Sequence, residues 1–184
     1  IALFARDGSL RAGLLVGADA VAGLLFGWGR MDTGALAQVA AWGRVAAWGL
    51  LPQAVSAVAL TVLASQRRLR PAAIIHGLAL VALLAAPAWL PRGGEALMGA
   101  LNGLFALIAG VLVACLGPAA RAAMPWRLMA VSTLALLAVA GLHSAFGFMG
   151  GTGLPGLAWA GVGAAAVLLS AWACDPVMKA ALRR

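Results

Sequence analysis

Residues 95–116 read EALMGALNGLFALIAGVLVACL, an apolar run of 22 residues in which Glu95 carries the only charge. A helix of this length rises about 33 Å, which matches a hydrocarbon core roughly 30 Å thick. The run lacks the two-residue alternation of apolar and polar positions that a barrel strand needs. Gly99 and Gly103 form a G-x-x-x-G pattern, which allows a neighbouring helix to approach closely. The stretch predicts a membrane-spanning helix.

The rest of the chain has the same apolar character. Of its 184 residues, 64% are hydrophobic and only 10% are charged, and the mean hydropathy is +1.02. A soluble domain needs roughly a quarter of its residues charged, so lipid is the expected solvent. Backbone groups in lipid must pair internally, which favours helices. The sequence therefore predicts an all-α integral membrane protein.

Six apolar runs, separated by stretches rich in turn-forming residues, are long enough to cross a bilayer. They cover about 9–28, 35–65, 71–90, 95–116, 127–148 and 154–173. The second run is too long for the bilayer, because as a straight helix it would extend about 46 Å. It contains Pro52, which removes a backbone hydrogen bond, so we expect a kink in the turn before this residue.

The basic residues indicate how these runs are oriented. With the N-terminus inside, ten of the 13 Lys and Arg residues fall on the inner side, which predicts N-in, C-in topology. The inner residues are Arg6, Arg11, Arg67, Arg68, Arg70, Arg121, Arg127, Lys179, Arg183 and Arg184. Arg30 and Arg92 fall outside. The net charge of +8 is thus spread over short loops, which argues against a nucleic-acid partner. The basic loop of Arg67, Arg68 and Arg70 is a cytoplasmic topology anchor or binds anionic headgroups.

Polar residues within the apolar runs are the candidates for function, because ionisable groups in lipid are costly. Asp19 either pairs with Arg44 or Arg30, lies near the outer interface, or contacts a substrate or ion. Arg44 either extends to the headgroups or lines a cavity that receives phosphates. Gln53 and Asn102 either bond across helices, which is the commoner role, or contact the substrate. Arg30 is a further candidate for substrate contact.

Residue patterns typical of enzymes and of metal or cofactor sites do not occur at useful spacing. The two cysteines are isolated, and His76 and His143 lie on different apolar runs. No Ser/His, paired Asp or Glu/His arrangement stands out. We therefore expect neither an enzyme nor a bound metal or cofactor.

Several short motifs, in order, resemble those of the MurJ/MviN family of lipid II flippases. LLFGWGR at 24–30 resembles the family's LLFGRG turn, with Trp in place of Arg. AWGLLP at 47–52 resembles its YALGLP helix, and SQRRLRP at 65–71 falls where the family has a cytoplasmic loop. Residues 95–113 and 163–184 are similar to two later family helices, the second with its short basic tail.

The resemblance implies that the chain corresponds to the last six of about fourteen helices in a two-lobed flippase. Because it begins at Ile1, we expect a fragment of a longer protein. Residues 1–116 would be the four-helix part of the C-terminal lobe, and 117–184 two extra helices that line an apolar groove for a polyprenyl tail. Gly49 and Pro52 are the candidate hinge of an alternating-access cycle.

The implied function is transport of a lipid-linked oligosaccharide, lipid II in particular, across the bacterial inner membrane. The expected partners are membrane lipids and a polyprenyl-diphosphate-linked substrate. One alternative is an O-antigen or capsule-unit flippase. Another is a non-transporting subunit that anchors a larger membrane or cell-wall complex, whose other subunits would be its partners.

Overall fold

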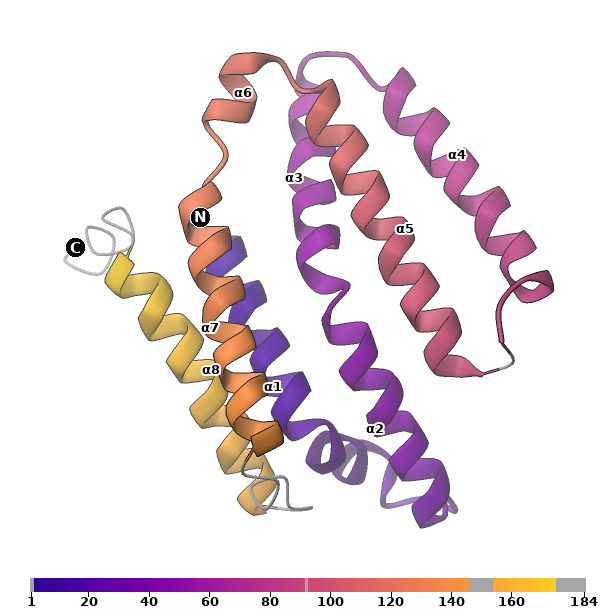
Figure 1. Cartoon of the computed structure of the whole chain (residues 1–184), viewed down its shortest axis with the longest axis vertical. Coiled ribbons are helices and arrows are strands. Elements are labelled where there is room, and N and C mark those ends of the chain that lie inside the picture. The colour runs from indigo at the N-terminus through magenta and orange to yellow at the C-terminus, as the bar shows by residue number, and fades with distance from the viewer. Residues whose placement is uncertain (1, 92, 146–153, 175–184) are drawn as a thin grey trace. The chain divides into compact units, whose positions relative to one another are not determined.

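The computed structural model describes residues 2–91, 93–145 and 154–174, which form helices joined by turns without any strand among them (Figure 1). The long helices are α1 (Ala2–Phe26), α2 (Thr33–Ala47), α3 (Leu50–Ser65), α4 (Arg70–Ala85), α5 (Gly94–Cys115), α7 (Trp126–Ala145) and α8 (Leu154–Cys174). A 3-10 turn, η1 (Ala86–Ala88), extends α4, and a short helix, α6 (Pro118–Ala122), follows α5.

The expected number of apolar helices is confirmed. Five helical segments are long and apolar enough to cross a membrane, and α2 and α3 make a sixth if they count as one interrupted span. The five are Asp7–Phe26, Arg70–Ala88, Gly94–Cys115, Trp126–Ala145 and Leu154–Ala173. The structure adds one element that the sequence did not predict, the short helix α6.

The long second run is broken where a kink was expected. Helix α2 ends at Ala47 and α3 begins at Leu50, with Trp48 and Gly49 in a turn between them. Pro52 has no N–H with which to bond the carbonyl of Trp48, four residues earlier. The next residue restores the helical pattern, because the Gln53 N–H donates to the Gly49 carbonyl at 3.1 Å.

The chain forms two compact units. The first unit holds α1, α2, α7 and α8, and the second holds α3, α4, η1, α5 and α6. These groupings reflect contacts between helices. They do not test the division into 1–116 and 117–184, which was based on the resemblance and stays a prediction.

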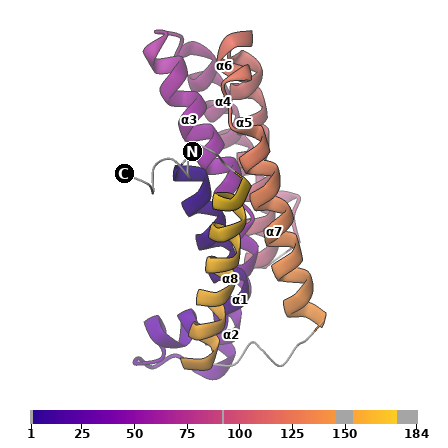
Figure 2. The ribbon, with the colours of Figure 1, turned by 90° about the vertical axis from the view of Figure 1, so that its left-hand side faces the viewer.

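In the first unit, α1 packs against α2, α7 and α8, and α1 and α8 lie side by side (Figure 2). The two helices approach closely at Gly17, where an added Cβ would stand only 2.4 Å from the Cβ of Ala160. Gly13 lies one turn earlier on α1, and a Cβ added there would stand 3.8 Å from the carbonyl oxygen of Ala160. Small residues at a four-residue spacing thus bring two apolar helices into close contact, as is typical of helix pairs in lipid.

In the second unit, α3, α4 and α5 bury a core that includes Leu63, Ile75, Ile108 and Leu112. The G-x-x-x-G pattern of α5 takes no part in it, because a Cβ at Gly99 or Gly103 would meet no described atom within 4 Å. The G-x-x-x-G pattern that marks a close helix contact is therefore that of Gly13 and Gly17 on α1.

The outward face of α4 is apolar and exposed. Ile74, Leu78, Val81 and Leu84 are 63%, 61%, 65% and 74% exposed. Large aliphatic side chains in such a continuous row would be costly in water. The row is the surface that a helix presents to lipid or to another apolar protein surface.

Candidate functional site

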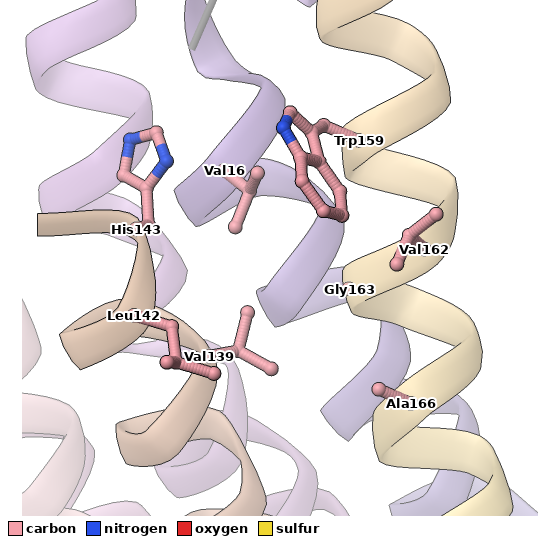
Figure 3. Close-up of a pocket in the computed structure, with 8 residues that line it drawn as sticks. All are labelled: Val16, Val139, Leu142, His143, Trp159, Val162, Gly163 and Ala166. Atoms are coloured by element: carbon pink, nitrogen blue, oxygen red, sulfur yellow. The ribbon is translucent and has the colours of Figure 1, made fainter. Parts of the chain in front are cut away.

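An apolar pocket of about 270 Å³ lies between α1, α7 and α8 of the first unit (Figure 3). Its lining residues are Val16, Val139, Leu142, His143, Trp159, Val162, Gly163 and Ala166. Except for the imidazole of His143 and the indole N–H of Trp159, these side chains offer only hydrocarbon. Gly163 keeps this wall open, since a Cβ there would already stand 3.3 Å from Cγ1 of Val139.

His143 gives the pocket a polar group. Figure 3 shows its ring on the α7 side of the pocket and Trp159 on the α8 side. The Nδ1 atom of His143 is buried and has no hydrogen-bond partner among the described residues. A buried polar atom left without a partner is costly, and a purely hydrocarbon ligand in the pocket would leave this cost in place. His76 differs, because its Nδ1 lies 2.7 Å from the Ala72 carbonyl of its own helix.

The structure brings two of the candidate residues together. Nη1 of Arg44 on α2 donates to Oδ2 of Asp19 on α1 at 2.7 Å. Their side chains are 37% and 31% exposed, respectively, so the ion pair is neither sealed in the core nor fully open. Of the interpretations left open for Asp19, the structure selects pairing with Arg44 over pairing with Arg30. Whether either residue contacts a substrate stays a prediction.

The other candidates are not part of this ion pair. Arg30 lies in the exposed turn after α1, and Asp32 in the same segment caps α2 by accepting a hydrogen bond from the Ala35 N–H at 2.7 Å. Gln53 is exposed in the first turn of α3, and Asn102 is half-buried on α5, both in the second unit. Their expected roles in substrate contact stay predictions.

The hinge and basic-loop candidates also belong to segments that the structure describes. Gly49 lies in the turn between α2 and α3, and Pro52 in the first turn of α3. Arg67, Arg68 and Arg70 are exposed around the turn from α3 to α4. Flexing at the hinge stays a prediction.

A buried polar group at the beginning of α1 was missed by the sequence analysis. The expectation that Arg11 lies in an inner loop is wrong, because it sits on α1 and is only 2% exposed. Its Nε donates to the Ala47 carbonyl at 3.3 Å, which places a cation against the last carbonyls of α2. Asp7, one helical turn earlier, and Ser132 on α7 are buried too.

A signal for this group was present in the sequence. Asp7 and Arg11 carry opposite charges at a spacing of four residues, which places them on one face of a helix. The first apolar run was taken to begin at about residue 9, whereas α1 begins at Ala2. Beginning the helix two turns earlier would have placed Asp7 on α1 together with Arg11, which already fell inside the predicted run.

Comparison with protein-family models, with curated proteins and with solved structures finds no match. In the part of the chain that the structure describes, no three His, Cys, Asp or Glu side chains are grouped so that they could hold a metal ion. The pocket and the ion pair of the first unit are therefore the features that bear on function.

Proposed function

We propose that this chain is the C-terminal part of a multi-pass flippase in the bacterial inner membrane, with N-in, C-in topology. Its substrate would be a polyprenyl-diphosphate-linked oligosaccharide, with lipid II as the first choice. The observation that carries the proposal is the apolar pocket between α7, α8 and α1. It lies between the two helices that, by the resemblance, would hold the tail of such a substrate.

The pocket suits part of a hydrocarbon chain. Pockets for whole small molecules usually measure about 300 to 1,000 Å³, and this one has about 270 Å³. It would therefore hold a few isoprene units while the rest of the tail stays in the bilayer. A tail needs no polar path, whereas a diphosphate head does, because its charges cannot cross hydrocarbon without compensation.

The ion pair of Asp19 and Arg44 supplies a group of the kind that the head requires. A guanidinium binds phosphate oxygens through two parallel N–H bonds, as it binds a carboxylate. Asp19 would hold Arg44 in place when no substrate is bound. A phosphate that replaced the carboxylate would change the partner of Arg44 without leaving the cation unpaired in a low-dielectric region.

Alternating access requires an element with two arrangements, which a substrate can bias. The interruption between α2 and α3 is the candidate, because a helix that lacks one backbone bond at Pro52 bends at lower cost than a continuous one. The protein would perform no covalent chemistry on its substrate.

The exposed apolar row on α4 supports a second candidate function. Ile74, Leu78, Val81 and Leu84 fit the surface of another membrane subunit as well as they fit lipid. A non-transporting anchor of a larger complex would use this row and would need no tail pocket. An O-antigen or capsule-unit flippase would use the same pocket, because its substrate has the same kind of tail.

Depletion of the protein in its host cell separates these functions. A lipid II flippase predicts accumulation of the lipid-linked peptidoglycan precursor at the inner leaflet. Complementation with Ala166→Trp, which places an indole at the pocket lining, should fail. Ala165→Trp, on an exposed position of α8 outside the pocket lining, should succeed. Accumulation of a different polyprenyl-linked unit would indicate the O-antigen type, and no accumulation would contradict transport.

A further inference from the structure

Four arginines gather at one end of the second unit. Leu63 at the end of α3, Ala72 at the start of α4 and Leu116 after α5 pack in one core cluster, and Ala120 of α6 packs against it. These contacts bring the turn from α3 to α4 and helix α6 to the same end, as Figure 1 also shows. Arg67, Arg68, Arg70 and Arg121 belong to these segments and are exposed. We call this set the arginine end.

Acidic residues of the second unit do not balance this charge. Between residues 48 and 124 the sequence contains one acidic residue, Glu95. Glu95 lies in the first turn of α5, whereas the arginine end begins where α5 ends at Cys115. Twenty helical residues separate the two by about 30 Å, several times the screening length at physiological ionic strength. The arginine end is thus a cationic surface without a nearby carboxylate from its own unit.

The backbone at this end holds an arginine where glycine is usual. Arg67 has a φ of 56° and follows the C-terminal residues of α3. The Arg68 N–H donates to the Leu63 carbonyl at 2.8 Å, and the Arg67 N–H to the Ala64 carbonyl at 2.9 Å. This pattern is a Schellman motif, whose left-handed position disfavours residues with a side chain. The turn therefore keeps a basic side chain at a position that glycine would occupy with less strain.

Below the arginines, the same face of α4 becomes hydrocarbon. Arg70, Ile74 and Leu78 follow one another at four-residue intervals, and such residues lie on one face of a helix. Ile74 and Leu78 are 63% and 61% exposed, and Leu69 beside Arg70 is 50% exposed. A ligand bound at the arginines therefore meets an apolar surface directly beneath its charged part.

We propose that the arginine end binds the headgroup of an anionic phospholipid, with its acyl chains along the apolar face of α4. A phospholipid with a net negative charge, such as phosphatidylglycerol, carries its charge in the headgroup and its hydrocarbon in the acyl chains. This order matches the arginines followed by the apolar face of α4. A nucleic acid would match the arginines and leave the aliphatic row uncovered. Each basic residue near an anionic bilayer surface contributes to binding, and several together give a selective site. The inference uses only the second unit and does not depend on flippase activity.

The test uses the purified protein in a neutral detergent. Native mass spectrometry counts bound phosphatidylglycerol and phosphatidylcholine, added at equal concentrations, on the wild type. The triple variant R67Q/R68Q/R70Q removes three charges, and the matched variant R67K/R68K/R70K keeps them. We expect phosphatidylglycerol to bind in preference to phosphatidylcholine. The affinity should fall about a hundredfold in the glutamine variant, since each charge contributes roughly fivefold.

Two outcomes would support the site further. The lysine variant should bind phosphatidylglycerol within a few-fold of the wild type, and the affinity of the wild type should fall as the salt concentration rises. The salt titration needs no variant, so it remains informative if the glutamine variant does not fold.

Other outcomes would overturn the proposal. Equal binding of phosphatidylcholine and phosphatidylglycerol would remove the role of charge. Binding of inorganic phosphate or of a short RNA as tight as that of phosphatidylglycerol would remove the role of the apolar row.

Discussion

The contact between α1 and α8 gives the sharpest prediction, because it depends on one missing methyl group. A Cβ on Gly17 would lie 2.4 Å from the Cβ of Ala160. Carbon atoms in good contact are about 3.5 to 4.0 Å apart, so Gly17→Ala requires the helices to separate by more than about 1 Å. Overpacking of this kind costs about 1–3 kcal/mol. An alanine also gains up to about 1 kcal/mol over glycine in a helix. With that gain subtracted, we expect a net loss of up to about 2 kcal/mol in the free energy of unfolding.

Two matched variants test the reasoning. Gly23→Ala is the same substitution on the same helix, and its Cβ would meet nothing within 4 Å. It should therefore be neutral or slightly stabilising. The exchange Gly17→Ala with Ala160→Gly moves the methyl from one helix to the other. With the Ala160 Cβ removed, the next neighbours of the new Cβ are Cα of residue 160 and the Gly156 carbonyl oxygen, both at 3.6 Å, which is ordinary contact.

The measurement is reversible unfolding of the purified protein in detergent, followed by the loss of helical circular dichroism. The exchange variant should recover most of the stability lost in Gly17→Ala, because the helix-propensity terms of its two substitutions nearly cancel. If Gly17→Ala is as stable as Gly23→Ala, or if the exchange recovers nothing, α1 and α8 do not cross at this point.

Three further predictions concern polar groups. A double-mutant cycle on Asp19→Asn and Arg44→Gln should give a coupling of about 1 kcal/mol in unfolding experiments, as expected for a partly exposed ion pair; strictly additive effects would contradict the pair. Ser132→Ala should leave the free energy of unfolding unchanged or raise it by up to about 1 kcal/mol, because the buried Oγ has no partner among the described residues. A clear loss in thermal stability would show that the hydroxyl is bonded. Arg67→Gly should stabilise the protein in neutral detergent by about 0.5–1 kcal/mol, because the φ of Arg67 is 56° and glycine adopts this conformation with less strain. Arg67→Ala should not stabilise it. Equal effects of the two substitutions would refute a left-handed turn.

The helices were predictable because the physics that forms them is local. Apolar runs of spanning length read as helices from composition alone, and α5 and α8 follow their predicted ranges to within one residue. The interruption before Pro52 was predictable for the same reason, because the lost hydrogen bond belongs to the proline itself. Asp32 at the start of α2 is a local capping signal of this kind.

The site was less predictable because it depends on which helices meet. Asp19 and Arg44 are 25 residues apart, and the sequence left four partners or environments open for Asp19. His143 lines a pocket only because α1 and α8 lie beside α7, and nothing near it in the chain indicates this. The G-x-x-x-G patterns illustrate the same limit. The sequence has this pattern at 13–17 as well as at 99–103, and packing engages Gly13 and Gly17 but leaves the pattern of α5 open.

The most direct measurement is photo-crosslinking with a polyprenyl diphosphate that carries a photoreactive group near the end of its tail. Peptide mapping should place the label on the segments that line the pocket, 139–143 of α7 and 159–166 of α8. Unlabelled polyprenyl diphosphate should compete, Ala166→Trp should abolish the labelling, and Ala165→Trp should leave it. Labelling spread over all apolar helices, or unchanged by Ala166→Trp, would contradict a tail-binding pocket and with it the proposed transport of a lipid-linked substrate.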